Sequence, residues 1–286
     1  MKRARPNSAN SGPGIEDVRN FWNRNPLWTG ESAFEPGTRE FFEEHRQVYR
    51  EDCFAGRMDE TIFPPEPGKQ RVLDLGCGVG FWLIEYWERG FRSLCGADLS
   101  ARSLEVATRR CALYGVEAEL VEQNAEALDF ADGAFTHVNC QGVIHHTPHP
   151  ERAIAEIHRV LAPGGTASIS VYYRNVILRH YRLFLPLIRL VHRLGGALKG
   201  RGRETIFALD DADKVVRYYD GAENPIGYAY TVGMLRTLVH PFEIERVYFH
   251  FFPARALPFA LPKFLHRLLD RRLPFMIYAS LRKPTG

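Results

Sequence analysis

The sequence predicts an α/β fold built on a mostly parallel sheet, and three observations support this prediction. Short apolar segments typical of strands alternate with longer segments of helical periodicity between residues 71 and 173. Glycine or proline stands at most of the boundaries between these segments. The 286-residue chain is 45% hydrophobic and 25% charged, which is enough apolar material for a sizeable core. Strands joined by helices of this length form parallel sheets with right-handed crossovers.

The first 66 residues precede the alternation. Residues 1–14 are polar and include glycine and proline, so we expect a disordered tail. Residues 15–66 are rich in aromatic side chains, and apolar residues recur every three to four positions over residues 41–49. That spacing predicts an amphipathic helix within an N-terminal helical cap.

Residues 67–173 are predicted to form the central, ligand-binding part of the sheet. A glycine lies at the end of each predicted strand in this region or within three positions of its start, and each predicted helix is long enough to cross over the sheet. The predicted strands are residues 71–76, 93–100, 118–123, 135–142 and 166–173, and the predicted helices are residues 81–90, 101–115 and 151–165.

The alternation stops at residue 174. Residues 174–230 form an insertion, whose first part, residues 174–203, contains eight Lys or Arg residues and no Asp or Glu. Residues 176–195 predict a basic helix with a strong apolar face, which could cover a binding pocket, contact an anionic membrane or form a homodimer contact. Residues 231–286 return to two helices and two strands that complete the sheet.

The bulk properties narrow the cellular setting. A formal net charge of +3 gives no argument for a nucleic-acid partner. The five cysteines form no C-x-x-C pair, which indicates reduced thiols rather than disulfides or a zinc site. No apolar run approaches the roughly 18 residues of a membrane span. We therefore expect a soluble, cytoplasmic protein.

The stretch RVLDLGCGVGFW, residues 71–82, places three glycines between a predicted strand and a predicted helix. Backbone N–H groups at such a turn face the carboxyl edge of the sheet, where ligands of open α/β sheets bind. Gly76, Gly78 and Gly80 give G-x-G-x-G, but Phe81 occupies the position where a dinucleotide site requires a further glycine. The bulky ring disfavours NAD or FAD, although a dehydrogenase is the alternative for the cofactor.

Polar residues follow the next strands at the same edge. Asp98 ends the second strand about 20 residues beyond the glycines, where a carboxylate can accept two ribose hydroxyls. Asn124 and Glu126 follow the third strand and could meet an adenine edge. Asp74 precedes the glycines and suits a cationic ligand group rather than a phosphate.

Taken together, these segments resemble class I S-adenosylmethionine-dependent methyltransferases, in particular the branch called methyltransferase type 11, which is similar to ubiquinone and menaquinone methyltransferases. The motifs that carry the resemblance are VLDLGCGVG, GADLS, NAEAL and GVIHHTPHPERAIAEIHRVLAPGG, in that order. The resemblance covers residues 71–173 and extends more loosely to the last two strands. It implies a Rossmann-like sheet of seven strands with an antiparallel last strand.

The resemblance also implies which residues bind S-adenosylmethionine and its product S-adenosylhomocysteine. Asp74 would face the methionine amino group, Asp98 the ribose and Gln141 the sulfonium. Arg50 could pair with the methionine carboxylate or be a solvated helix charge. The complete set of cofactor-binding residues implied is Asp74, Gly76, Cys77, Gly78, Asp98, Leu99, Asn124, Ala125, Glu126 and Gln141.

The segment VIHHTPHP supplies the candidate bases. It follows the fourth strand, and histidine titrates near neutral pH, so His145 and His146 could take a proton from the acceptor, with His146 the better candidate. The alternative is that the two histidines only tie this loop to neighbouring backbone. We expect no metal at His145, His146 and His149, because prolines interrupt the segment and no nearby carboxylate or cysteine completes a ligand set.

Four aromatic residues are candidates for the acceptor pocket. Tyr172 and Tyr173 end the fifth strand, Tyr219 lies in the insertion and Trp22 lies in the cap, and packing in the core is the alternative for each. The sequence thus predicts methyl transfer to O, N, S or C of a small molecule. The alternatives are RNA methylation and a regulatory protein that binds S-adenosylmethionine without catalysis. The identity of the acceptor and the oligomeric state are not predicted.

Overall fold

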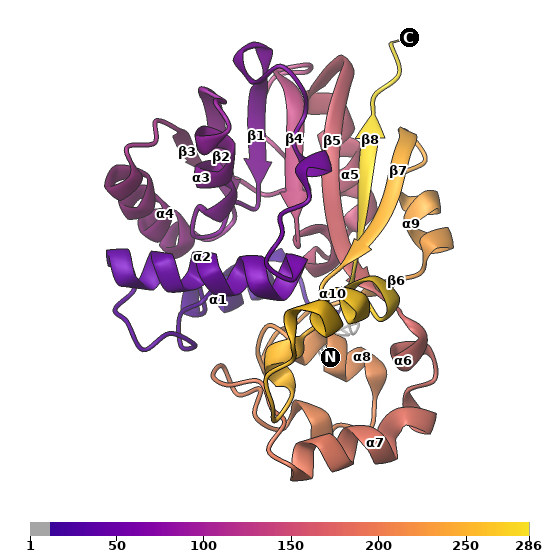
Figure 1. Cartoon of the computed structure of the whole chain (residues 1–286). Coiled ribbons are helices and arrows are strands. Elements are labelled where there is room, and N and C mark those ends of the chain that lie inside the picture. The colour runs from indigo at the N-terminus through magenta and orange to yellow at the C-terminus, as the bar shows by residue number, and fades with distance from the viewer. Residues whose placement is uncertain (1–11, 286) are drawn as a thin grey trace, which may run out of the picture.

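A computed structural model describes residues 12–285 of the chain, and it has the α/β architecture that the sequence predicts (Figure 1). The predicted tail therefore lies largely outside the described residues. The strands are β1 (Arg71–Leu75), β2 (Ser93–Asp98), β3 (Glu119–Glu122), β4 (Phe135–Gln141), β5 (Leu161–Tyr173), β6 (Ala229–Tyr230), β7 (Glu243–His250) and β8 (Met276–Arg282).

The strands form one sheet in the order β3-β2-β1-β4-β5-β8-β7. The first five strands on this path are parallel to their neighbours, whereas β8 runs antiparallel to both β5 and β7. The predicted antiparallel last strand is thereby confirmed. The two-residue strand β6 pairs with the end of β5 and makes the sheet eight-stranded, one strand more than expected.

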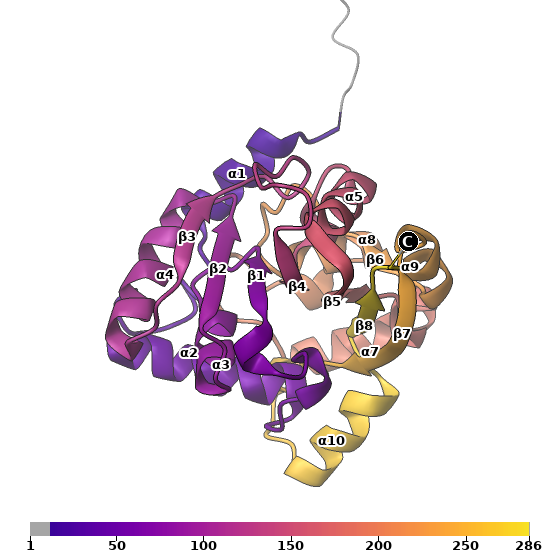
Figure 2. The same ribbon diagram turned by 90° about the horizontal axis from the view of Figure 1, so that it is seen from above.

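Helices cover both faces of the sheet, with α3 on one face and α5 on the other (Figure 2). Apolar residues of α3 pack with β8 in one core cluster, and those of α5 and α9 pack with β4 and β5 in another. The helices are α1 (Ile15–Arg24), α2 (Arg39–Phe54), α3 (Phe81–Glu88), α4 (Ala101–Tyr114), α5 (Pro150–Val160), α6 (Val176–Arg179), α7 (Tyr181–Arg193), α8 (Ala212–Tyr218), α9 (Val232–Leu238) and α10 (Lys263–Arg272).

Two predicted elements differ from the structure. The helix expected over residues 151–165 ends at Val160, because Leu161 already pairs with Phe135 as the first residue of β5. The basic helix expected over residues 176–195 is divided at His180 into α6 and α7. These two short helices, with α8 and α10, form a group of helices beyond the carboxyl ends of the parallel strands (Figure 1).

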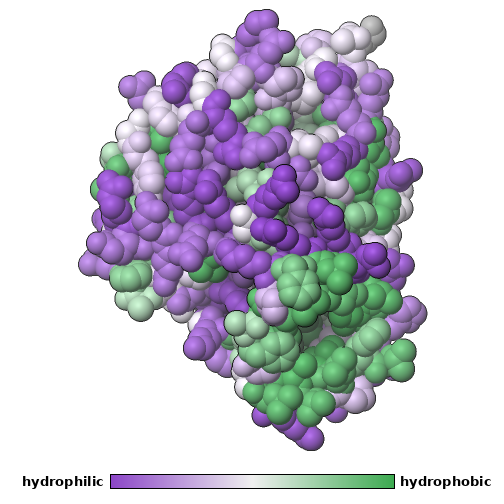
Figure 3. Space-filling view, in the orientation of Figure 1, coloured by the Kyte–Doolittle hydropathy of each residue, from purple (hydrophilic) through white to green (hydrophobic). Residues whose placement is uncertain are grey.

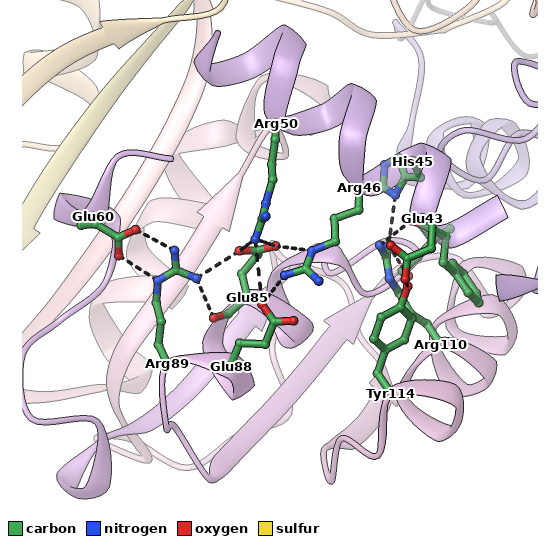
Figure 4. Close-up of polar contacts among 12 residues, drawn as sticks. Glu43, His45, Arg46, Arg50, Glu60, Glu85, Glu88, Arg89, Arg110 and Tyr114 are labelled. Atoms are coloured by element: carbon green, nitrogen blue, oxygen red, sulfur yellow. Dashed lines mark hydrogen bonds and ion pairs between the residues drawn. The ribbon is translucent and has the colours of Figure 1, made fainter. Parts of the chain in front are cut away.

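A buried carboxylate attaches the N-terminal cap to the core. Glu85 of α3 is fully buried and accepts hydrogen bonds from three arginines (Figure 4). Arg46 and Arg50 reach it from α2, at 3.0 and 2.7 Å, and Arg89 reaches it at 3.0 Å from the end of its own helix. Burial alone would raise the pKa of Glu85, but the three guanidinium groups lower it below its ordinary value. Arg50 therefore serves the fold, and neither interpretation from the sequence was correct.

The Glu85 network leads to a stability prediction. Glu85→Gln keeps the shape of the side chain but removes the charge that three arginines share, so we expect the free energy of unfolding to fall by about 2 kcal/mol. Urea denaturation monitored by circular dichroism measures this loss. Glu88→Gln is the matched control, because Glu88 lies one turn further on with a side chain that is 43% exposed, and should cost below about 1 kcal/mol. Equal losses in the two variants would contradict the role given to Glu85.

Candidate functional site

The glycine loop follows β1 and reaches a pocket at the carboxyl edge of the sheet. Gly76 and Gly78 adopt φ values of +72° and +51°, which favour glycine. A Cβ atom on Gly76 would lie 2.2 Å from Cγ2 of Val143, so the first glycine makes room for the loop after β4. A Cβ atom on Gly78 would meet no atom within 4 Å, and both glycines line the pocket. The backbone at Gly78 is thus open to a ligand.

Asp98 joins the glycine loop to the end of β2. Its carboxylate accepts hydrogen bonds from the backbone N–H groups of Gly78 and Ser100, each at 2.8 Å. Burial raises the pKa of Asp98, while these donors oppose that shift. Asp98, Leu99, Asn124 and Ala125 line the same pocket as the glycines. Four cofactor-binding candidates from the ends of β2 and β3 therefore line the same cavity as the glycine loop.

Asp74 does not line the pocket. It is connected to the pocket wall through the side chains of Asn139 and Gln141. Its Oδ1 accepts a hydrogen bond from Asn139 at 2.8 Å, and Oδ1 of Asn139 accepts one from Gln141 at 3.0 Å. Burial raises the pKa of Asp74 to about 7. Gln141 lines the pocket, and its buried Oε1 has no hydrogen-bond partner among residues 12–285. That unsatisfied acceptor fits a ligand with an amino group.

Two other cofactor-binding candidates do not line the pocket. The Oε1 atom of Glu126 accepts a hydrogen bond from the backbone N–H of His149 at 2.7 Å, so this carboxylate points to the start of α5. Cys77 is buried in the core, and its backbone N–H donates to the carbonyl of Ala97 at 3.0 Å. The side chains of Glu126 and Cys77 therefore support the loops rather than face the cavity.

The second half of the pocket is aromatic. Trp22, His145, His146, Tyr172 and Tyr219 line it together, although they come from the cap, the β4 loop, β5 and the insertion. The ring of Trp22 lies 5.4 Å from that of His146, and the ring of Tyr172 lies 4.1 Å from that of His145. The structure thus brings three of the four predicted acceptor residues to the two histidines.

Tyr173 is the fourth candidate, and its position contradicts the prediction. Its side chain packs on Phe249 at 4.9 Å between ring centres, and its hydroxyl accepts a hydrogen bond from Arg179 at 2.8 Å. Successive residues of a strand point to opposite faces, so β5 can direct only one of its two terminal tyrosines into the pocket. Tyr172 is the one that it directs inward.

His146 is held on both sides of its ring. Its Nδ1 lies 2.7 Å from the carbonyl oxygen of Ile226, and its Nε2 lies 3.0 Å from Oδ2 of Asp220. The hydroxyl of Tyr172 donates to the same carboxylate oxygen. Burial alone would raise the pKa of Asp220, but the hydrogen bond and charge of His146 lower it overall. His146 therefore has no free nitrogen for an acceptor.

His145 has the free nitrogen that His146 lacks. Its side chain is 1% exposed, and within the described part of the chain its Nδ1 has no hydrogen-bond partner. Burial, with a smaller contribution from His146, lowers the pKa of His145 well below its ordinary value. A buried imidazole of this kind is neutral at neutral pH and so has a nitrogen able to accept a proton, while the same burial makes it a weaker base than a solvated histidine. The geometry thus reverses the order in which the sequence ranked the two histidines.

A carboxylate joins the two histidines, which the sequence did not predict. His145, His146 and Asp220 offer ligand atoms that all lie within 4.8 Å of one another, whereas His149 is exposed and lies 3.6 Å from Glu151. The expectation that no carboxylate completes this set was wrong, because the insertion brings Asp220 back over the β4 loop. The carboxylate of Asp220 already has two protein partners, the ring of His146 and the hydroxyl of Tyr172, which explain why it can be buried.

Charged residues that the sequence analysis did not single out form the far wall of the pocket. Glu31 lies 2.7 Å from Arg203 and 2.9 Å from Arg255, and Arg255 also pairs with Asp52. Burial raises the pKa of Asp52 to about 6. The buried hydroxyl of Tyr219 has no partner among the described residues and lies beside this wall. The hydroxyl of Tyr219 is therefore available to bind a ligand in the aromatic part of the pocket.

Comparisons with known proteins agree with this arrangement. Residues 72–165 match a family model described as "Methyltransferase domain". The demethylmenaquinone methyltransferase of Thermus thermophilus is 32% identical over 139 residues, which cover 47% of this chain and 62% of the relative. The ubiquinone biosynthesis O-methyltransferase of Ralstonia nicotianae is 36% identical over 112 residues, which cover 39% of this chain and 46% of the relative. The chain thus spans less than two thirds of the length of these relatives.

The fold of most of the chain also resembles that of a solved structure. The crystal structure of an S-adenosylmethionine-dependent methyltransferase from Methanosarcina mazei superposes with a TM-score of 0.54 at 19% identity. The match covers 79% of this chain and 96% of the other. At that identity the likeness concerns the fold, and the site has to be interpreted from the residues described above.

Proposed function

We propose that this chain, whose residues 72–165 match a family model described as "Methyltransferase domain", is a class I S-adenosylmethionine-dependent methyltransferase that transfers a methyl group from that cofactor to a small-molecule acceptor. One observation carries the proposal. A single pocket is lined both by Gly78 and Asp98 and by His145 and Tyr219. One end has the groups that a nucleoside requires, and the other has an aromatic enclosure with a free imidazole nitrogen.

The first end fits the cofactor. When bound, S-adenosylmethionine supplies an activated methyl group on a sulfonium, so the chain mainly has to align the acceptor and exclude water. The backbone at Gly78 would pass along the cofactor, and Asp98 would accept the ribose hydroxyls. The unsatisfied Oε1 of Gln141 would accept a hydrogen bond from the methionine ammonium group. Asp74 would support Gln141 from behind through Asn139.

The second end fits an acceptor that loses a proton. The imidazole of His145 is neutral and its Nδ1 has no partner among the described residues, so in the tautomer with the proton on Nε2 this nitrogen could take the proton from the acceptor group that becomes methylated. His146 and Asp220 would act as positioning residues, because their hydrogen bonds fix Tyr172 and the β4 loop around the acceptor. Trp22 and Tyr219 would enclose the acceptor and exclude water.

The cellular setting that we propose is cytoplasmic. The five cysteines form no disulfide in the described part of the chain, which is typical of a reducing compartment. No helix among residues 12–285 has the length and apolar character to cross a bilayer. The partner that we propose for catalysis is a small molecule rather than a nucleic acid, because the formal net charge is only +3.

A labelling experiment tests the proposed activity. The purified chain is incubated with S-adenosylmethionine labelled on its methyl group and with fractionated metabolite extract, and labelled products are identified by mass spectrometry. We expect one class of small molecule to acquire the label, in parallel with formation of S-adenosylhomocysteine. Calorimetric titration should detect S-adenosylmethionine and S-adenosylhomocysteine but not NAD. Tight cofactor binding without a labelled product in any extract would instead favour a regulatory protein.

A further inference from the structure

An exposed apolar surface lies on the helices beyond the pocket. Green side chains gather over α10 and, below it, over α7 in Figure 3. We call this the α7–α10 surface. Its large side chains are well exposed: Leu183 at 76%, Leu187 at 58%, Leu194 at 63%, Phe259 at 59%, Phe264 at 75% and Leu268 at 49%. Soluble monomers rarely expose contiguous apolar patches of this kind without a partner.

The periodicity of both helices directs these side chains outward. Leu183, Leu187 and Leu194 follow one another at four and seven positions, so they form one stripe along α7. Phe264 and Leu268 form the corresponding stripe on α10. The core requires neither stripe, because other side chains anchor both helices: Tyr181 of α7 is 5% exposed and His266 of α10 is 7% exposed.

The two stripes belong to one surface. Gly195 and Gly196 follow α7 and lie against the segment that leads into α10. A Cβ atom on Gly196 would lie 3.0 Å from the carbonyl oxygen of Ala256, and one on Gly195 would lie 4.0 Å from Cβ of Pro258. The end of α7 and the start of the α10 segment are therefore in direct contact.

Exposed cations surround the apolar stripes. Arg182, Arg189 and Arg193 are exposed on α7, and Lys263, Arg267, Arg271 and Arg272 are exposed on α10. The acidic residue within α10, Asp270, is 4% exposed and accepts hydrogen bonds from His250 and from the backbone N–H of Phe251. Its charge is thus paired in the interior. Lys263 lies 3.5 Å from Glu51, and the other cations lie beside the apolar side chains.

We propose that the α7–α10 surface docks the protein onto an anionic lipid bilayer. The apolar side chains would enter the boundary between headgroups and acyl chains, and the cations would lie among anionic headgroups. A second copy of the chain fits the charges less well, because a two-fold interface on this surface would face arginines with arginines. Charge complementarity thus favours the bilayer.

The docked surface lies beside the acceptor end of the pocket. A groove lined by Asp52, Arg255, Phe259 and Leu261 runs from this surface to the wall of the pocket. Asp52 and Arg255 line both this groove and the pocket. If the proposed function holds, the ion pair between Arg255 and Asp52 separates the active site from a groove that opens toward the bilayer. The acceptor class that this arrangement serves is an apolar molecule dissolved in the membrane.

Vesicle sedimentation tests the docking without requiring activity. The full chain is mixed with phosphatidylcholine vesicles that contain about 30% phosphatidylglycerol, or with phosphatidylcholine alone, at about 0.15 M salt. We expect sedimentation with the anionic vesicles, weaker binding to the neutral ones, and release at about 1 M salt. The double variants Leu187→Gln/Phe264→Gln and Arg189→Glu/Arg193→Glu should each lower the partition coefficient tenfold or more.

Matched substitutions on a distant helix provide the control. Met234 is 50% exposed and Arg236 is also exposed on α9, so Met234→Gln/Arg236→Glu changes the same residue types away from the surface. This variant should bind vesicles like the unchanged chain. Equal losses in the control, or no binding of the unchanged chain to anionic vesicles, would overturn the proposal. Light scattering that shows a dimer separated by Leu187→Gln/Phe264→Gln would assign the surface to a second copy instead.

The acceptor class has its own test, which depends on the proposed function. Labelled S-adenosylmethionine is supplied with either the lipid or the aqueous fraction of an extract. We expect the label in the lipid fraction. Label confined to the aqueous fraction would overturn the membrane-dissolved acceptor while leaving methyl transfer intact. Absence of label from both fractions would contradict the proposed function, whereas vesicle binding would be judged separately.

Discussion

Replacing Asp98 with alanine is expected to weaken binding of S-adenosylmethionine about a hundredfold or more. In the proposed complex this carboxylate accepts two ribose hydroxyls, and each hydrogen bond to a charged group contributes about 1.5–3 kcal/mol. The carboxylate also accepts the backbone N–H groups of Gly78 and Ser100, so its loss additionally loosens the glycine loop. Isothermal titration calorimetry with the cofactor measures the dissociation constant.

Two further variants make the Asp98 result interpretable. Asp98→Asn retains one acceptor oxygen and should lose less affinity than the alanine variant. Glu122 pairs with Asp98 across the β2–β3 register and lies outside the pocket lining, so Glu122→Ala should leave the dissociation constant unchanged. Thermal unfolding without ligand shows whether each variant is folded. A folded Asp98→Ala variant that binds as tightly as the original chain would remove the ribose assignment.

The local elements of the fold could be predicted because their causes are local. The alternation of strands and helices over residues 71–173 carries its own periodicity and its own turn residues, and strands joined by helical crossovers pair in parallel, as β1 to β5 do. The placement of Gly78 and Asp98 at one cavity follows from the same rule, because parallel strands end at a common edge. Phe81, which argued against a dinucleotide, packs in the core behind the loop.

The acceptor end could not be predicted because its residues come from distant segments. Asp220 lies 74 positions after His146 in the chain, and Glu31 pairs with arginines more than 170 positions away. Nothing in the sequence around Glu31 distinguishes it from a solvated acid. Tyr172 and Tyr173 illustrate another limit, because adjacent strand residues point to opposite faces and the sequence did not indicate which face held the pocket.

One signal in the sequence could have identified a buried charge. Glu85 is the one acid within the apolar run FWLIEYW, residues 81–87, and a carboxylate in such a run requires partners from elsewhere. The cap supplies them as Arg46 and Arg50. Recognising this need would have assigned Arg50 to the fold rather than to a ligand.

Replacing His145 with alanine is expected to lower kcat by about 10²- to 10⁴-fold, the range typical for removal of a general base. The cofactor dissociation constant should not change, because His145 lies at the acceptor end of the pocket and the cofactor at the other. His146→Ala should lower kcat less, about tenfold, since both of its nitrogens bond to the protein and its effect acts through Asp220. Steady-state kinetics and cofactor titration of both variants separate these outcomes.

The pH dependence distinguishes a base from a structural histidine. A base must be unprotonated to act, and burial lowers the pKa of His145 well below 6.5, its ordinary value. The kcat of the unchanged chain should therefore stay level as the pH falls through 6.5 and decrease only at lower pH. The His145→Ala variant should lose that acid limb, because the group that becomes protonated is absent. A limb that persists in the variant, or a kcat that His145→Ala does not change, would place the base elsewhere.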